Sequence, residues 1–421
     1  MNTVSDGGTR LRSPRVLLAS WTCTAMAFGT VAGPAVGILA STLIDRFELT
    51  RADIGRMAAL YALVGAAVSP LTGRLADRFG GTRMVVATFA GSCVAFLAFA
   101  AAGSYAMLLV AATISGIPNG TGNQATNRLI ATQIPASERG VVTGVKQSGV
   151  QLGRFLAGLI LPSSVAAWGL TRSYLVLAVL ALLGAAVTLV LLGDHSQARP
   201  APSNPTDHRG APLPPAVWWL CGYAFLMGAA AGATGAFTAL FAEQDVGLSR
   251  AEAGVLVGVT GGAAVLSRIL LSRLVQHVRH YGPPLAWLAL GSSASLCLTA
   301  AASGWGRWAL WLGVTGVAIT VGSWNSVAML GAMASVPLAQ AGRSSGRVMV
   351  GFLGGLGLAP PLFGAAVDRS GSYAWCWLGL TATSVAALVA MLLWSRLDRL
   401  DRHPTATAAI ATATVAPNRN S

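Results

Sequence analysis

The chain has 421 residues, of which 54% are hydrophobic and only 10% are charged. Its 28 basic and 14 acidic side chains fall far below the roughly 105 charges that a soluble protein of this length carries at the usual quarter share. The 50 glycines follow no collagen-like period and lie within long apolar runs, where small residues let membrane helices pack closely. The composition therefore excludes a soluble enzyme and indicates an integral membrane protein.

Twelve apolar runs approach or exceed the length of about 20 residues that a transmembrane helix needs. They lie at 16–43, 54–72, 84–103, 106–134, 141–163, 173–193, 216–241, 253–271, 284–303, 307–336, 344–366 and 373–395. The first run is longer than the apolar part of a signal peptide and no cleavage site follows it, so we expect it to remain as a membrane helix. The predicted fold is an all-α membrane protein with twelve transmembrane helices.

The distribution of basic residues orients the chain in the membrane. Seventeen of the 28 lie in segments on the side of the N-terminus, and six lie in the loops on the other side. Because cytoplasmic loops carry the excess of basic residues, we expect both termini to lie in the cytoplasm. The expected location is the inner or plasma membrane of the cell. No soluble surface combines basic and aromatic side chains, so nucleic acid is not an expected partner.

The cysteines and histidines offer no catalytic pair and no metal-ligand spacing. All five cysteines fall in apolar runs, where they are expected to be small buried hydrophobes, and all five histidines lie in loops or in the tail. We therefore expect no catalytic residue, no metal site and no cofactor. Motifs for nucleotide hydrolysis are also absent from the sequence, which argues against a primary pump.

A proline-rich polar segment at 194–215 divides the twelve runs into six and six. The segment Leu49–Gly55 matches Leu248–Gly254 at a shift of 199, and each copy carries a predicted capping box, Thr50 with Asp53 and Ser249 with Glu252. At a shift of 202, five further residues recur: Asn123, Pro135, Gly144, Gly149 and Gly153 fall on Asn325, Pro337, Gly346, Gly351 and Gly355. The predicted organisation is a cytoplasmic segment 1–15, a six-helix bundle 16–193, a cytoplasmic linker 194–215, a second bundle 216–395 and a disordered cytoplasmic tail 396–421.

The segment Gly73–Arg83 lies between the second and third runs and resembles the cytoplasmic loop signature of the major facilitator superfamily. It matches that signature at Gly73, Leu75, Asp77, Arg78 and Gly80. The family's two basic positions after Gly80 are Gly81 and Thr82 here, with Arg83 one place later. With the twelve runs and the internal repeat, the resemblance covers 16–395 and implies a transporter built from two pseudo-symmetric six-helix bundles.

The resemblance also implies a cytoplasmic gate, formed by Gly73, Asp77, Arg78, Gly80 and Arg83. A carboxylate is stabilised beside a helix N-terminus, and the run 344–366 begins on the same side, so we expect Asp77 to latch the two halves together there. The alternative is a solvated turn that only orients the loop. In the second half Gln276 and His277 occupy the positions of the acid and the base, which predicts a weaker latch.

The chain departs from the drug/proton antiporter branch of this family at two positions. The arginine of that branch's fourth helix is Ala112 here, aligned through Gly116. The proline of its fifth-helix signature is replaced by Arg154, within Gly153–Gly158. These departures disfavour drug/proton antiport.

Every ionisable side chain predicted to lie within the membrane is basic: Arg128, Lys146, Arg154 and Arg268. Each costs about 2.5–3.5 kcal/mol at a helix centre, and no acid lies at mid-membrane to compensate it. An anionic substrate is the simplest counter-ion. The alternatives are that Arg128 and Arg268 extend to the membrane surface and that Arg154 binds a backbone carbonyl.

The run 141–163 has a polar face and a packing face. At about 100° per residue, Gln147, Gln151 and Arg154 follow one stripe, and Lys146 lies beside it. Gly149 and Gly153 form a GxxxG pair on roughly the other side, which suits close helix contact.

Other candidates come from the family resemblance. Arg268 resembles the eighth-helix arginine of oxalate/formate exchangers and monocarboxylate transporters. In this family the first, fourth, seventh and tenth helices line the cavity, and the matching polar or aromatic positions are Trp21, Thr24, Asn123, Asn127, Tyr223, Trp324 and Asn325.

The sequence thus predicts a monomeric secondary or facilitative transporter of a small organic anion such as a carboxylate, working by alternating access. The expected substrate-binding residues are Arg154, Lys146, Gln147, Gln151, Arg128, Arg268, Asn123, Asn325, Trp324 and Tyr223. Exchange against a counter-anion, as in an antiporter, or facilitated flux is preferred to proton symport, because Lys146 is the one interior group able to release a proton. The alternatives are efflux of an uncharged or lipophilic compound, and a transporter-like sensor or scaffold without turnover.

Overall fold

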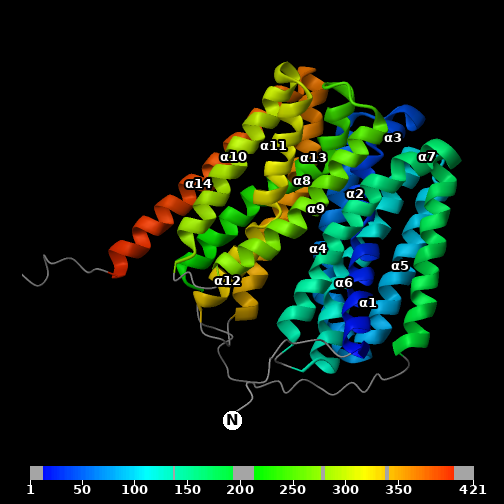
Figure 1. The fold of residues 1–421 in the computed structure, drawn as a ribbon, viewed down its shortest axis with the longest axis horizontal. Helices are drawn as coiled ribbons and strands as arrows, with labels where there is room; N and C mark the ends of the chain where they lie inside the picture. The colour runs from blue at the N-terminus through cyan, green and yellow to red at the C-terminus, as the bar shows by residue number, and fades with distance from the viewer. Residues whose placement is uncertain (1–12, 136–137, 193–212, 276–279, 337–340, 403–421) are drawn as a thin grey trace, which may run out of the picture.

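The computed structural model describes residues 13–135, 138–192, 213–275, 280–336 and 341–402, and within these ranges every regular element is an α-helix (Figure 1). The N-terminal half comprises α1 Ser13–Thr30, α2 Ala32–Ile38, α3 Ala40–Phe47, α4 Arg51–Phe79, α5 Gly81–Ala101, α6 Tyr105–Gln133 and α7 Arg139–Leu192. The C-terminal half comprises α8 Pro215–Gln244, α9 Arg250–Val275, α10 Gly282–Trp305, α11 Arg307–Val321, α12 Trp324–Ala334, α13 Ala341–Ser370 and α14 Tyr373–Arg402.

The predicted all-α membrane fold is confirmed, and each of the twelve predicted runs falls on one or more of these helices. By length and composition, seven described helices can cross a membrane, namely α4, α5, α7, α8, α10, α13 and α14. The bent pair α1 and α2 raises that number to eight. The count of twelve spans is consistent with this arrangement.

Four predicted runs differ from the structure in their local backbone. The run 16–43 is bent by 51° between α1 and α2, and the run 307–336 is interrupted after Val321, where α12 begins only at Trp324. Conversely, the runs 141–163 and 173–193 join in α7, whose one non-helical residue is Gly169 with φ 81° and ψ 164°. Apolar length predicts a span but not such local breaks, and a glycine takes a positive φ without the steric cost of a Cβ.

The boundaries of the predicted segments shift at both ends and at the linker: α1 begins at Ser13 and α8 at Pro215, inside the segments predicted as 1–15 and 194–215. Helix α14 continues to Arg402, so the start of the predicted disordered tail 396–421 is helical. The reason is that extending an existing helix adds a hydrogen bond for each residue fixed, whatever its hydropathy. The remainder of that tail, most of the linker 194–215 and most of the segment 1–15 lie outside the described residues.

Both predicted capping boxes are confirmed. At the start of α4, the Thr50 amide donates to Asp53 Oδ2 at 2.9 Å and the Asp53 amide donates to Thr50 Oγ1 at 3.2 Å. Before α9, the Ser249 amide donates to Glu252 Oε2 at 2.8 Å and the Glu252 amide donates to Ser249 Oγ at 3.2 Å. The two halves therefore start equivalent helices in the same way.

The internal repeat reappears as equivalent helix packing. Helix α7 packs on α1 through two glycines, and α13 packs on α8 through the two glycines at the matching positions. A Cβ at any of them would press on the facing backbone, in the pairs Gly149 on Cys23, Gly153 on Ala27, Gly351 on Cys221 and Gly355 on Phe225. The GxxxG packing face predicted for the run 141–163 is thus confirmed.

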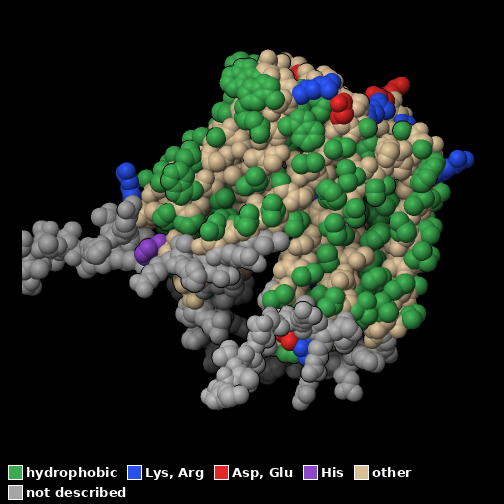
Figure 2. All heavy atoms as spheres, in the orientation of Figure 1, with side chains coloured by type: hydrophobic (Ala, Val, Ile, Leu, Met, Phe, Trp, Pro, Cys, Tyr) green, Lys and Arg blue, Asp and Glu red, His purple; other side chains and the backbone are tan. Residues whose placement is uncertain are grey.

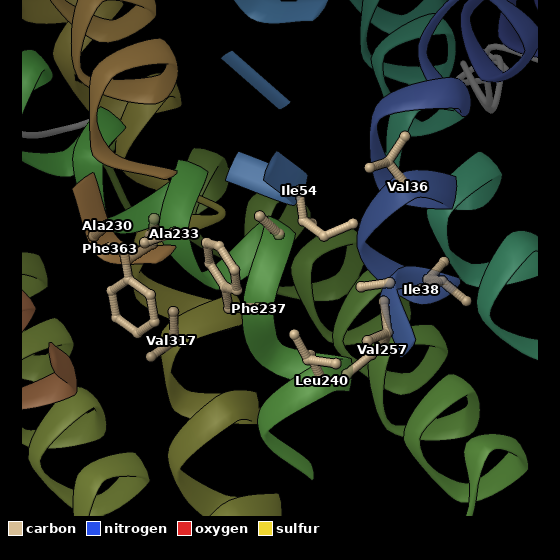
Figure 3. Close-up of a cluster of buried hydrophobic side chains, with 14 of the residues drawn as sticks. Val36, Ile38, Ile54, Ala230, Ala233, Phe237, Leu240, Val257, Val317 and Phe363 are labelled. Atoms are coloured by element: carbon tan, nitrogen blue, oxygen red, sulfur yellow. The ribbon is translucent and has the colours of Figure 1, made fainter. Parts of the chain in front are cut away.

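The two halves touch at one end of the bundle and diverge toward the other, as Figure 1 shows. Figure 3 shows apolar side chains of both halves meeting, with Ile38 and Ile54 facing Phe237 and Val257. Side chains at the touching end also cross between the halves, as in the ion pair of Arg250 with Asp45. We call this the closed end.

The opposite end carries the α4–α5 turn at Gly80 and the first residues of α7 and α13; we call it the open end. Among the described residues, the ion pairs found there stay within the N-terminal half, Arg15 with Glu138 and Arg128 with Asp77. On the face seen in Figure 2, hydrophobic side chains cover the flanks and charged side chains gather toward the ends, as expected of a bilayer-spanning protein.

Candidate functional site

A cavity of about 120 Å³ lies between the two halves. Gln151 and Arg154 of α7 form its wall on the N-terminal side. Residues of α8, α9, α11 and α13, with Gly322 just after α11, supply the other walls: Ala231, Thr234, Thr238, Thr260, Ala264, Val314, Val317, Ala318, Val321, Gly322 and Phe352. No acidic residue is among these lining residues.

The polar groups of the α7 wall have no partners among the described residues. Over the described residues, neither Gln151 nor Arg154 forms a side-chain hydrogen bond or an ion pair, and Arg154 Nε is buried without an acceptor. Both side chains lie on the stripe predicted to be polar, while Gly149 and Gly153 on the other face pack against α1. An unpaired guanidinium in a membrane-embedded cavity is costly, so this wall can bind a ligand that supplies acceptors.

The facing wall combines three threonines with an apolar surface. Thr234, Thr238 and Thr260 donate their hydroxyl hydrogens to carbonyls of their own helices, at 2.6, 2.7 and 2.7 Å. Their oxygens therefore remain available as acceptors on the cavity side. The threonines were not predicted from sequence, although Thr234 and Thr238 are spaced i, i+4 in an apolar run, which could have indicated a shared polar stripe.

Lys146 lies in a separate polar cluster between α6 and α7. It is fully buried, and its ammonium donates to Asn123 Oδ1 at 2.7 Å and to Asn127 Oδ1 at 2.5 Å. Gln147 Nε2 donates to the same Asn123 oxygen at 3.3 Å. Lys146 is therefore not among the residues that line the cavity described above, and neighbouring amides hold its ammonium.

Arg268 binds the backbone where the predicted tenth helix is interrupted. Its Nε donates at 3.0 Å to the carbonyl oxygen of Gly322, which lies between α11 and α12. One residue earlier, Ser267 Oγ lies 2.6 Å from Ser323 Oγ. Because a helix break exposes backbone acceptors in a membrane, Arg268 stabilises the interruption rather than extending to the membrane surface.

Arg128 pairs with the loop that was predicted to be a gate. Arg128 Nη1 lies 3.6 Å from Asp77 Oδ1, and the Asp77 side chain is 72% exposed. Gly80 ends α4 with φ 85°, and a Cβ at Gly81 would lie 2.6 Å from the Leu129 amide nitrogen, so these glycines bring the turn against α6. Asp77 therefore contacts its own half in this structure. The side chains at 341–343, near the predicted latch, are not among those that the structure describes.

The remaining predicted gate residues are Arg78, Arg83 and Gly73. The guanidinium of Arg78 lies 5.3 Å from the ring centroid of Phe79, and Arg83 is exposed at the start of α5. A Cβ at Gly73 would meet only the Gln124 side chain at 3.9 Å, which is ordinary contact. The geometry thus requires glycine at the α4–α5 turn but not at position 73.

The three remaining second-half candidates are not among the residues that line the cavity. Tyr223 is fully buried and donates its hydroxyl to the Leu285 carbonyl at 3.0 Å. Trp324 is also buried and packs on Tyr223 and Phe352, with ring centroids 6.0 and 5.2 Å apart. Asn325 Oδ1 is buried without a hydrogen-bond partner among the described residues. Tyr223 and Trp324 therefore contribute to packing in this conformation.

Solved structures of transporters share this fold. A bacterial homologue of the human lysosomal transporter Spinster, in an inward-facing and occupied conformation, superposes with a TM-score of 0.72 over 91% of this chain and 97% of that chain, at 16% identity. A D-xylose–proton symporter gives a TM-score of 0.73 over 90% and 96%, also at 16% identity. At these identities the likeness establishes the fold alone.

Sequence relatives cover less of the chain. An uncharacterized MFS-type transporter of Mycobacterium tuberculosis is 26% identical over 69% of this chain and 66% of its own length. A probable nitrate/nitrite transporter of the same organism is 29% identical over 55% of this chain and 60% of its own length, and a human synaptic vesicular amine transporter is 32% identical over 38% and 30%. This chain thus matches less than two thirds of the length of each.

The family model of the Major Facilitator Superfamily matches residues 18–346, which is most of the chain. The matched region includes the loop Gly73–Arg83, α7 with its cavity wall, and the interrupted pair α11 and α12. Together with the fold, this match identifies the chain as a member of the Major Facilitator Superfamily.

Proposed function

We propose that this transporter carries a small organic anion such as a carboxylate, bound in the cavity by Arg154 with Gln151. The observation that carries the proposal is the Arg154 side chain, which lines the cavity without a partner among the described residues. A guanidinium can hold a carboxylate through two parallel N–H bonds, which gives both energy and orientation. The anion would thus supply the hydrogen-bond acceptors that the Arg154 guanidinium lacks among the described residues.

The other walls suggest what accompanies the anionic group. The threonine oxygens of the facing wall accept hydrogen bonds, so a hydroxyl or amino group on the substrate would suit them. Val314, Val317, Val321 and Phe352 provide an apolar surface for a short hydrocarbon part. The favoured substrate class is therefore a short carboxylate with an apolar body and one hydrogen-bond donor.

The names of the relatives indicate substrates of opposite charge. The nitrate/nitrite transporter is named for anions, whereas the vesicular transporter is named for amines. An amine entering a low-dielectric cavity needs a nearby carboxylate, and none lines this one. The lining residues thus favour the anion.

The open and closed ends correspond to an inward-facing step of the transport cycle, if the open end lies in the cytoplasm. With the open end in the cytoplasm, as the basic residues predict, the cavity would face inward and the closed end would seal it from outside. Alternating access would then move one half against the other around the cavity. The protein would reside in the plasma or inner membrane with both termini cytoplasmic.

A second candidate is efflux of an uncharged or lipophilic compound. The apolar valine and alanine wall favours it, because such a surface binds hydrocarbon without needing a charge. The two functions differ in their requirement for Arg154, so one variant separates them.

The test is a thermal-shift screen of the purified protein with paired probes, each short carboxylate beside its neutral amide and with nitrate included. A ligand that binds the folded state at a hundred times its Kd adds about 2.7 kcal/mol of stability. We expect carboxylates to raise Tm and their amides to have little effect. A uniform response to neutral and anionic probes would favour the second candidate.

The variants then locate the binding group. Arg154→Gln should weaken carboxylate affinity about tenfold to a hundredfold, the equivalent of about 1.5–3 kcal/mol, and Arg154→Lys should weaken it less. Arg172→Gln is the matched control, since it removes an exposed arginine from the same helix and should leave affinity unchanged. Unchanged carboxylate affinity in Arg154→Gln would refute the anion site.

A further inference from the structure

Helix α13 ends in a segment whose spacing matches the loop segment at the end of α4. Both read Gly-x-x-x-Asp-Arg-x-Gly, with Gly73, Asp77, Arg78 and Gly80 in the first and Gly364, Asp368, Arg369 and Gly371 in the second. The final glycine of each takes a positive φ, 85° at Gly80 and 67° at Gly371. This likeness is separate from the half-chain repeat, because the two copies lie at opposite ends of the bundle.

The two helices that carry these segments pack against each other in opposite directions. Helix α4 runs from the closed end to the open end, and α13 runs back. They approach closely, since a Cβ at Gly55 would lie 2.6 Å from the Pro360 carbonyl carbon and one at Gly357 would lie 2.7 Å from Leu63 Cγ. As a result, the C-terminal end of α13 reaches the N-terminus of α4.

Asp368 caps that N-terminus from the other half of the molecule. Its Oδ2 accepts from the Ala52 amide at 2.9 Å, and its Oδ1 accepts from the Arg51 amide at 3.2 Å. Thr50 takes the next amide, that of Asp53, so the first three amides of α4 are all bonded. A carboxylate at this position also favours the positive end of the helix dipole.

The surrounding residues hold this contact. A Cβ at Gly364 would lie 2.6 Å from the Arg51 carbonyl carbon, so glycine is what allows the two backbones to meet. Arg51 Nη1 lies 3.4 Å from Asp368 Oδ1, and Arg51 Nη2 donates to Gln244 Oε1 at 2.8 Å. Tyr373 OH donates to the same oxygen at 2.8 Å. The α4 N-terminus is thus tied to three helices of the C-terminal half.

We propose that Gly364–Gly371 is the latch of the closed end, the counterpart of Gly73–Gly80 at the open end, and that the two carboxylates engage in turn. In this structure Asp368 is 24% exposed and bonded across the halves, whereas Asp77 is 72% exposed and pairs within its own half. When the halves rock, Asp368 leaves α4 and Asp77 meets the start of α13 at Ala341. The inference requires a member of this transporter family but no particular substrate.

Four glycines offer label sites that leave the packing intact. A Cβ at Gly103, Gly304, Gly144 or Gly346 meets nothing within 4 Å. Gly103 and Gly304 report the separation of the halves at the closed end, and Gly144 and Gly346 report it at the open end. The test measures these two distances by pulsed electron-spin resonance in nanodiscs, with cysteines for labelling at each pair and the five native cysteines replaced by alanine.

Asp368→Ala should raise the ratio of molecules whose closed end has separated to molecules whose closed end is shut about tenfold. This is the scale of one charged hydrogen bond. Gly364→Ala should shift the same distances in the same direction, because it separates the backbones. Asp368→Asn should fall between the wild type and Asp368→Ala, because its amide oxygen can still cap the helix. Asp77→Ala should act at the other end, lowering the share of molecules whose open end has closed.

Asp45→Ala is the matched control. It removes another carboxylate that crosses the halves at the closed end, but its pair with Arg250 is more than half exposed on both sides and should matter little. Each variant is first checked for folding by size-exclusion profile and helicity. The proposal is overturned if Asp368→Ala and Gly364→Ala leave the closed-end distances as in the wild type, or shift them no more than Asp45→Ala does.

Discussion

The two halves of the molecule share their backbone contacts but not the polar residues of α7. Each starts a helix with a capping box, and each presses a pair of glycines against its first long helix. The polar α7 positions have apolar counterparts at the 202-residue shift: Lys146 falls on Val348, Gln151 on Leu353 and Arg154 on Leu356. The repeat therefore serves helix packing, whereas the polar groups of α7 do not belong to the scaffold.

The difference between the halves separates structural from functional roles. A residue pair that both halves use, such as Gly149 and Gly351, is needed wherever two helix backbones meet. A buried cation that only one half has cannot be a requirement of the shared architecture, because the other half folds without it. Each prediction below tests one part of this comparison.

The largest expected effect is on folding, at the shared glycines. Gly149→Ala and Gly351→Ala each place a Cβ against a facing carbonyl oxygen and should destabilise the protein by roughly 1–3 kcal/mol or more. The matched controls are Gly144→Ala and Gly346→Ala, whose Cβ would meet nothing within 4 Å and which should stabilise by about 0.5–1 kcal/mol. Tm in detergent measures all four; a loss in one half only would contradict the shared scaffold.

A second expected effect concerns proton coupling, for which Lys146 of the N-terminal half is the candidate that the sequence predicts. No acid or histidine lies among the cavity residues, so transport of the carboxylate found by the screen should proceed without proton uptake. If a pH dye inside liposomes does report uptake, Lys146→Arg should reduce it to background, because an arginine keeps its proton. Proton uptake that survives Lys146→Arg would refute this assignment.

The capping boxes should give equal and moderate effects. Thr50→Ala and Ser249→Ala each remove one hydroxyl that accepts from a helix amide, which should cost about 1 kcal/mol. Chemical denaturation of the reconstituted protein measures both. A much larger loss for Thr50→Ala than for Ser249→Ala would mean that the contact with Asp368 adds to this cap.

The smallest expected effect is at the open end. Asp77→Asn removes the charge that would bind the α13 N-terminus, a contribution of about 0.3–1 kcal/mol, so transport should fall by up to about fivefold while folded protein stays constant. Gln276→Ala, at the corresponding second-half position, should change transport less. Flux divided by the folded protein in the membrane measures both, and equal small effects would count against an asymmetric gate.

The fold could be predicted from the sequence because its determinants are local. A span needs only enough apolar residues, a capping box needs two residues three apart, and the GxxxG face of α7 needs only helical periodicity. The breaks at Val31 and Gly322 could not be predicted, because tertiary contacts bend those helices. One such contact is the bond from Arg268 to the carbonyl of Gly322.

The candidate site could be predicted only in part. The stripe of Gln151 and Arg154 followed from helical periodicity, and both residues line the cavity. Periodicity could not separate Lys146 from this stripe, because its partners Asn123 and Asn127 belong to another helix. The facing threonines were missed because nothing in an apolar run shows which side meets the other half.

By itself the sequence determined the membrane class, the two-half organisation and the cations that no mid-membrane acid compensates, because hydropathy, repeat and charge are properties of the chain. Only the tertiary structure decided which cation keeps a guanidinium without a partner among the described residues. Asn123 and Asn127 hold Lys146, Gly322 binds Arg268 and Asp77 pairs with Arg128, whereas Arg154 lines a cavity. The physical reason is that compensation of a buried charge depends on which helices pack around it, and that is settled only when the two halves meet.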